Sequence, residues 1–178
     1  MSFLKLVQKR RSCRRYSSQT VPQECLDRCL EAARLAPSAC NSQPWRFIVV
    51  THPALKAELA QKAFSKIYSM NTFAAQAPVL IVLVRERSKY MAQLGGFVRG
   101  VQYSLIDLGI VGEHFILQAA EEGLGTCWIG WFNERAVKKT LGLSRQDKVD
   151  IIISVGYPEE IETYDKKRKD LTEFREFR

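Results

Sequence analysis

The chain is poor in the side chains from which most catalytic and metal sites are built. Only 2 histidines occur among its 178 residues, and the 5 cysteines include no CxxC pair. Cys25 and Cys29 lie four apart on one face of an expected helix, but with only His52 and His114 elsewhere they make a poor zinc site. The cysteine runs of iron–sulfur proteins are also missing. We therefore interpret the cysteines as reduced thiols, with Cys25 and Cys29 packed in the core, and expect no metal.

Sequence signatures of nucleotide and acyl chemistry are absent too. Gly123, Gly125 and Gly130 follow an expected helix with GxGxxxxG spacing, whereas the dinucleotide fingerprint is GxGxxG after a strand. The chain has no GxxxxGK(S/T) phosphate loop and no GxSxG nucleophile elbow. Cys127 with His114 is a poor nucleophile pair, because Cys127 lies in an apolar strand pattern.

Long apolar runs are missing as well. No stretch reaches the roughly 18 residues that a membrane span needs, and the basic N-terminus lacks the apolar core and cleavage site of a signal peptide. No repeat or low-complexity tract interrupts the chain. A length of 178 residues is enough for one domain with a core and too short for two ordinary ones. The expectation is one cytoplasmic domain, residues 1–178, with no membrane partner.

Positive charge is plentiful and unevenly placed, with a net charge of +8. Basic residues gather near both ends of the chain: Lys9, Arg10, Arg11, Arg14 and Arg15, then Lys166, Lys167, Arg168 and Lys169. Because the termini of a compact domain often lie close together, the two groups would make a compact anion pocket if they converge. Solvated tails are the alternative, and composition alone slightly favours them. A nucleic-acid partner is disfavoured, since no recognised reader motif or aromatic stacking platform accompanies the charge.

Hydrophobic periodicity predicts an irregular alternation of helices and strands. Helices are expected over residues 3–9, 21–36, 53–69, 101–122 and 133–143. Apolar runs rich in β-branched residues predict strands over residues 46–51, 78–86, 126–132 and 149–158. We therefore predict an α+β fold of three layers, with one mixed or antiparallel sheet flanked by helices.

The expected helix 101–122 has an apolar stripe wide enough for a buried central helix. Gly109 and Gly112 inside it lower its helix propensity, so they suggest close packing against another backbone. Asp107 and Glu113 lie six residues apart on it, which does not place them on one face as an acid pair.

Three segments need a common explanation. RRSCRRY, residues 10–16, carries guanidinium groups suited to bidentate phosphate recognition. APSACNSQPWRFIVV, residues 36–50, places two prolines, several short hydrogen-bonding side chains and a tryptophan before an expected strand. GLGTCWIGWF, residues 123–132, has glycines where a flat ligand can approach the backbone closely.

In this order and spacing, these segments and IIISVGYP, residues 151–158, resemble the FMN-dependent nitroreductase family over residues 6–171. The resemblance implies homodimers with two flavin sites at the subunit interface, each built from both chains. It also implies NADH or NADPH as the electron donor, and nitroaromatics, quinones or other small molecules as acceptors in a ping-pong cycle. An FMN-binding storage or sensor protein without efficient NAD(P)H turnover is the alternative.

The resemblance also implies roles for the basic residues. Arg10, Ser12 and Arg14 match the N-terminal flavin motif of the family, and Lys166 with Arg168 matches a basic pair after the last strand. Arg10 and Arg168 are expected on the FMN phosphate, which carries close to two negative charges. Arg14 is expected near the N1–O2 edge of the ring, where a positive charge stabilises the reduced flavin.

Around the ring, the resemblance implies backbone N–H groups of Gly130 and Trp131 facing flavin N5, and Asn71 at the pyrimidine edge. Trp131 is bulky for its position and is expected to narrow the open face of the ring. Residues 87–100 are interpreted as a lid or a plain loop. Residues 165–178 are expected to form an arm that docks on the second subunit, with a frayed helix as the alternative.

The loop before the first strand is expected to reach the flavin of the partner subunit through Pro37, Ser38 and Asn41, with Gln43 close by. Ordinary turn chemistry is the alternative role of Ser38 and Asn41. No catalytic side chain is implied, because the cofactor carries the chemistry. The full set of expected cofactor-binding residues is Arg10, Arg11, Ser12, Arg14, Pro37, Ser38, Asn41, Gln43, Asn71, Gly130, Trp131, Lys166 and Arg168.

Overall fold

The structure, a computed structural model, describes residues 2–86, 90–160 and 166–178. Its helices are α1 (Phe3–Lys9), α2 (Gln23–Arg34), η1 (Ala39–Asn41), α3 (Pro53–Ala63), η2 (Lys66–Gln76), α4 (Tyr90–Arg99), α5 (Tyr103–Glu121), α6 (Glu134–Thr140) and α7 (Leu171–Phe174), of which η1 and η2 are 3-10 helices. Its strands are β1 (Trp45–Val50), β2 (Val79–Arg85), β3 (Gly125–Ile129) and β4 (Lys148–Gly156). Among the described residues, no helix combines the length and apolar character needed to cross a membrane.

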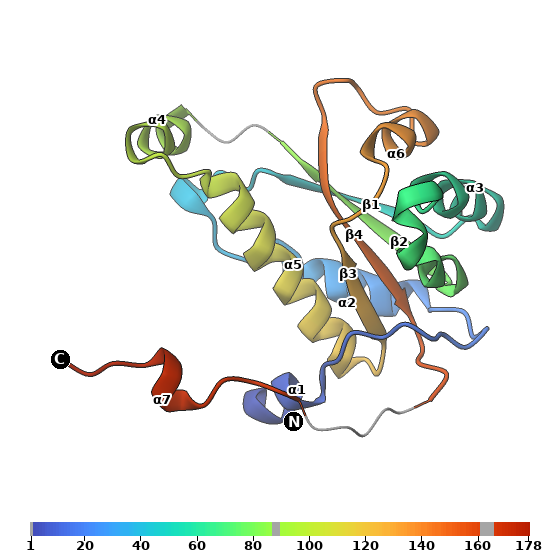
Figure 1. Ribbon diagram of the computed structural model, residues 1–178, viewed down its shortest axis with the longest axis horizontal. Coiled ribbons are helices and arrows are strands. Elements are labelled where there is room, and N and C mark those ends of the chain that lie inside the picture. Colours follow the sequence, from blue (N-terminus) through green and yellow to red (C-terminus); the bar gives the residue numbers. More distant parts are fainter. Residues whose placement is uncertain (1, 87–89, 161–165) are drawn as a thin grey trace.

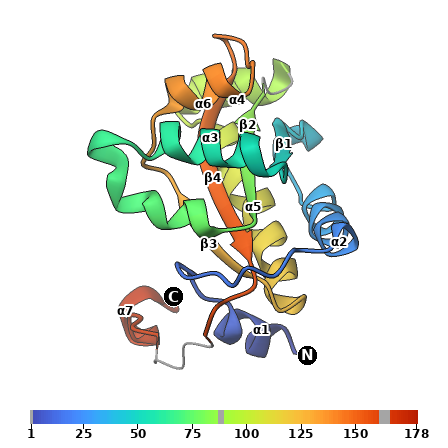
Figure 2. The same ribbon diagram turned by 90° about the vertical axis from the view of Figure 1, so that its right-hand side faces the viewer.

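The four strands form one antiparallel sheet in the order β1-β2-β4-β3. Side chains of β2 alternate between two cores, because successive residues of a strand point to opposite faces. Val79, Ile81 and Leu83 pack with α2 and α5, whereas Leu80 and Val82 pack with α3 and α6. Figures 1 and 2 show these helix pairs on opposite faces of the sheet. The predicted three-layer α+β fold is confirmed, with the sheet antiparallel.

The central helix α5 buries most of its predicted stripe, including Phe115, whose ring lies 5.7 Å from that of Phe47. The prediction for its two glycines was wrong. A Cβ on Gly112 would lie 2.5 Å from the Trp128 ring, so this glycine makes room for a side chain rather than a backbone. Around Gly109, no atom of the described residues beyond its chain neighbours and its own helix backbone lies within 4 Å of a Cβ position, and this glycine lies on the exposed face of the helix.

Two further expectations need correction. The helix expected over 53–69 ends at Ala63, and a left-handed Lys66, with φ of 57°, starts the separate helix η2. Residues 90–99 form helix α4, not a plain loop. Residues 87–89 lie outside the described residues, so whether 87–100 acts as a lid stays a prediction.

The basic N-terminal segment is attached to the sheet. Ser12 forms a parallel bridge with Thr126 at the start of β3, and the Cys13 N–H donates to the Thr126 carbonyl at 2.8 Å. Tyr16 is buried, and its hydroxyl lies 2.7 Å from the Ser154 hydroxyl. Burial raises the pKa of Tyr16, so the phenol stays neutral. These contacts fix the backbone that carries the arginines.

Candidate functional site: a basic cluster beside strand β3

Basic side chains from the two ends of the chain meet next to α1. Lys166 donates from Nζ to the Val7 carbonyl at 2.6 Å. Burial lowers the pKa of Lys166, and the charges of Arg10, Arg11 and Arg168 lower it further. These four basic groups are therefore within electrostatic range of one another. The hydrogen bond between Lys166 and Val7 shows that the two basic ends of the chain converge.

Arg14 lies against η2, through its contact with Phe73. Its guanidinium carbon lies 5.8 Å from the centre of the Phe73 ring. Burial raises the pKa of the Cys127 thiol, and the positive charges of Arg14 and Arg10 oppose that rise. Cys127 is therefore a buried thiol within electrostatic range of both arginines.

Asn71 and Trp131, expected around the same ring, are in direct contact. The Asn71 side-chain amide donates to the Trp131 carbonyl at 2.8 Å, and the Trp131 indole N–H donates to the Ile67 carbonyl at 3.1 Å. The Tyr68 ring packs against Trp131 with centroids 5.3 Å apart. Strand β3 ends at Ile129, so the exposed Gly130 and Trp131 follow it outside the sheet. The Trp131 backbone is held against η2, the helix that also carries Phe73.

The loop between α2 and β1 lies in a different part of the structure. Figures 1 and 2 show it near the start of α5, whereas the N-terminal segment lies near the end of α5. Pro37 is exposed at its entry. The Gln43 N–H donates to the Ser38 hydroxyl at 2.9 Å, and the Gln43 side-chain amide donates to the Asn41 side-chain oxygen at 2.9 Å. One chain thus brings Pro37, Ser38, Asn41 and Gln43 together but away from the basic cluster.

The backbone of this loop is strained. Cys40, Asn41 and Gln43 have φ of 53°, 48° and 46°, values that residues other than glycine seldom adopt. Such conformations cost of order 1–3 kcal/mol each and persist where the surroundings impose them, most often at functional sites. The strain favours a functional role over ordinary turn chemistry.

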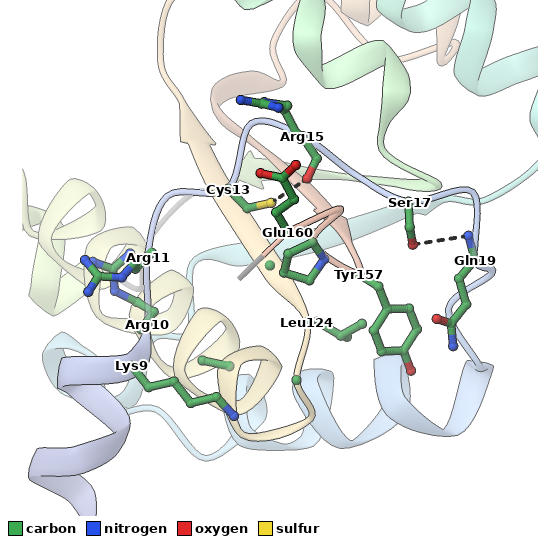
Figure 3. A pocket seen from close by; sticks show the side chains of 14 residues that line it. Lys9, Arg10, Arg11, Cys13, Arg15, Ser17, Gln19, Leu124, Tyr157 and Glu160 are labelled. Atoms are coloured by element: carbon green, nitrogen blue, oxygen red, sulfur yellow. Dashed lines mark hydrogen bonds between the residues drawn. The ribbon is translucent and has the colours of Figure 1, made fainter. Parts of the chain in front are cut away.

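A cavity of about 520 Å³ lies between the N-terminal segment, the end of α5 and the residues after β4. Its lining includes Lys9, Arg10, Arg15, Leu124 and Tyr157 (Figure 3). Ser12, Arg14, Asn71 and Trp131 do not line it. The cavity therefore adjoins the cluster at Arg10 and does not coincide with the expected ring site.

Sequence reasoning missed several residues that shape the site. Phe73 and Tyr68 of η2 pack on Arg14 and Trp131, and Tyr16 fastens the N-terminal segment through Ser154. The stretch SMNTFAAQ, residues 69–76, has no distinctive pattern, so only the tertiary contacts could have singled out Phe73. No group of three or more His, Cys, Asp or Glu side chains that could hold a metal occurs within residues 2–86, 90–160 and 166–178.

Comparisons with known proteins agree with this architecture. The model of the nitroreductase family matches residues 7–71 and 68–157. The NADH dehydrogenase of Thermus thermophilus is 31% identical, over 85% of this chain and 84% of its own. A nitroreductase family protein from Clostridium novyi NT superposes with a TM-score of 0.78 at 31% identity, covering 90% of this chain and 87% of its own. An FMN-dependent nitroreductase from Clostridium difficile R20291 gives 0.72 at 29% identity, covering 97% and 94%. The chain therefore belongs to the nitroreductase family.

Proposed function

We propose that the protein is an FMN-dependent oxidoreductase that takes electrons from NADH or NADPH and passes them to nitroaromatics, quinones or similar small acceptors. The observation that carries the proposal is the hydrogen bond from Lys166 to the Val7 carbonyl, which brings the basic C-terminal segment to Arg10 and Arg11 where the N-terminal segment is fastened to β3. A phosphate monoester is a dianion, and fixed cations with several N–H donors bind it well. The cytoplasmic location expected from the sequence stays a prediction.

The residues present fit an FMN molecule that spans two neighbouring regions. In this proposal Arg10, Lys166 and Arg168 hold the phosphate, with Arg11 and Ser12 beside them. Arg14, which lies over the Phe73 ring of η2, would hold the flavin ring. A guanidinium there favours negative charge at the N1–O2 edge of the ring.

The proposed contacts at the other side of the ring come from Gly130, Trp131 and Asn71. The bond from Asn71 to the Trp131 carbonyl holds the backbone of residues 130–131 in place, so its N–H groups can point at flavin N5. Bound FMN would supply hydride acceptance from the nicotinamide and electron transfer to the acceptor, in two successive half-reactions. Trp131, 54% exposed, bounds the space in which nicotinamide and acceptor alternate.

A complete site requires a second copy of the chain in this proposal. Helix α5 rises about 20 Å between Asp107 and Glu121 at 1.5 Å per residue. The loop 37–43 lies near the start of α5 (Figure 1), whereas Arg10 lines the same cavity as Ala120 near its end. Exposed apolar side chains suited to a dimer contact are Phe3, Leu4, Leu105, Ile106, Leu171, Phe174 and Phe177. The last three belong to residues 165–178, the proposed exchanging arm of a single flavin-binding domain.

The first experiment is an anaerobic absorbance scan of protein reconstituted with FMN, before and after NADH or NADPH is added. We expect flavin bands near about 370 and 450 nm that bleach on addition of either donor. Bands that persist with both donors would favour the storage or sensor alternative. Protein that stays colourless with excess FMN would exclude both functions.

If each flavin site is built from both chains of a dimer, two chains with different damaging substitutions should complement each other. Asn41→Ala is expected to lower FMN retention without unfolding the protein, because Asn41 is exposed and bonded within its own loop. A heterodimer of an Asn41→Ala chain with an Arg10→Ala chain should contain one intact site and retain about half the wild-type FMN. FMN per dimer, measured on differently tagged chains, checks this. A heterodimer with both changes in one chain is the control, since both of its sites are damaged.

A further inference from the structure

Asp107 of α5 lies under the strained loop. It is 2% exposed, and its Oδ1 accepts a hydrogen bond from the Ala39 N–H at 3.0 Å. Ala39 is the first residue of η1, directly before the left-handed Cys40 and Asn41. The carboxylate therefore connects a rigid, buried helix to the point at which the loop enters its unusual conformation.

The burial of the Asp107 carboxylate lowers the stability of the fold. The second carboxylate oxygen, Oδ2, is buried and has no hydrogen-bond partner among the residues that the structure describes. A buried carboxylate with one oxygen unsatisfied destabilises a protein unless the other oxygen makes a valuable contact. The contact that Asp107 makes is a charge-assisted bond to a backbone amide, which is stronger and more directional than a neutral one.

Other hydrogen bonds of the loop hold it together from within. Ser42 donates its hydroxyl to the Ala39 carbonyl at 2.7 Å, and the Ser38 hydroxyl accepts from Gln43. These bonds make the loop a compact unit. Asp107 then determines where that unit stands relative to α5, because Ala39 belongs to it.

We propose that Asp107 is a positioning residue that sets the loop Ser38–Gln43 for contact with the flavin of the partner subunit. The inference rests on the proposed flavin function for its ligand. The hydrogen bond from the Ala39 N–H to Asp107 does not depend on any ligand. A loop released from Asp107 can relax its left-handed residues, and the amide and hydroxyl groups of Asn41 and Ser38 then lose their alignment.

The experiment compares Asp107→Ala, which deletes the acceptor, with Asp107→Asn, which keeps an oxygen in place of Oδ1. Ala39→Pro deletes the donor instead, and the extended Ser38, with ψ of 159°, suits a following proline. Val111→Ala, one turn further along the buried face of α5, is the matched control for a general loss of stability. Two quantities are measured: amide hydrogen exchange at residues 38–43 without FMN, and the FMN dissociation constant from flavin fluorescence.

Asp107→Ala should speed exchange at Ala39 and weaken FMN binding roughly tenfold or more, the loss expected for one bond to a charged group. Ala39→Pro should weaken FMN binding similarly, and Asp107→Asn should recover most of the affinity. Val111→Ala should lower the melting temperature and leave the FMN affinity unchanged. Equal losses in Val111→Ala and Asp107→Ala, or unchanged binding in Ala39→Pro, would overturn the proposal. If the wild-type protein binds no FMN, the proposed function is wrong. If amide exchange at Ala39 is unchanged in Asp107→Ala, only the proposed role of Asp107 in fixing Ala39 is wrong.

Discussion

Replacing both Arg10 and Arg168 by alanine is expected to weaken FMN binding by about 10²–10⁴-fold. Each substitution removes a hydrogen bond to a charged group, worth roughly 1.5–3 kcal/mol, and about 1.4 kcal/mol corresponds to a factor of ten. The fold should persist, because Arg168 is exposed and the Arg10 backbone keeps its bond to the Leu6 carbonyl. Fluorescence titration of apoprotein with FMN at fixed ionic strength measures the change. Riboflavin, which lacks the phosphate, should bind both proteins equally weakly.

The control for net charge is the pair Arg135→Ala and Arg145→Ala. Both side chains are exposed, and Arg135 lies on α6, in the layer away from α1 and α5. The control removes the same two charges from the protein without touching the basic cluster. If it weakens FMN binding as much as the first pair, long-range attraction explains the effect and the phosphate assignment is wrong. Unchanged affinity in the first pair would contradict the assignment directly.

Most of the fold follows from local patterns. The run PVLIVLVRE predicts a strand buried on both faces, and β2 is buried along almost its whole length. The expected helix 53–69 shows where patterns fail. Its sequence continues to favour a helix after Ala63, but the Asn133 N–H binds the Ala63 carbonyl at 2.9 Å and Lys66 turns left-handed. A contact between residues 70 positions apart stops the helix, and no local signal announces it.

The candidate site also has one part that the sequence reveals and one part that it does not. The charges of Arg10, Arg11, Lys166 and Arg168 are visible in the sequence, but the tendency of termini to converge left solvated tails open. It was the resemblance to the family that gave both basic groups one role at the flavin phosphate. The register that pairs Ser12 with Thr126 was not predictable, because it depends on contacts across more than a hundred residues.

Asp107 was missed for a related reason. In the sequence it is one acid on a helix, and it was considered only as a partner for Glu113. Its real partner is the backbone amide of Ala39, a group that every residue except proline carries and that no side-chain pattern marks. Strain at Cys40 and Asn41 was equally invisible, since neither residue type demands a left-handed conformation.

Gly125→Ala is expected to destabilise the protein by about 1–3 kcal/mol, the usual cost of overpacking, and to weaken FMN binding roughly tenfold through one displaced charged contact. A Cβ on Gly125 would lie 2.6 Å from the Cys13 Cβ and 2.8 Å from its Sγ. Cys13 cannot easily move, because its N–H binds the Thr126 carbonyl and its thiol donates to the Arg15 carbonyl at 3.0 Å. Relief of the clash therefore displaces the segment that carries Ser12 and the arginines. Urea unfolding of the apoprotein and FMN titration measure the two effects.

Gly95→Ala on α4 is the matched control, because beyond its chain neighbours and its own helix backbone no atom of the described residues lies within 4 Å of its Cβ position. It should leave FMN affinity unchanged and stabilise the helix by up to about 1 kcal/mol. Removing the obstructing side chain in Cys13→Gly combined with Gly125→Ala should restore FMN binding relative to Gly125→Ala alone. Such recovery locates the effect at the contact between β3 and the N-terminal segment. If Gly125→Ala binds FMN like the wild type while losing stability, the segment tolerates the displacement, and its attachment to β3 matters for folding but not for holding the cofactor.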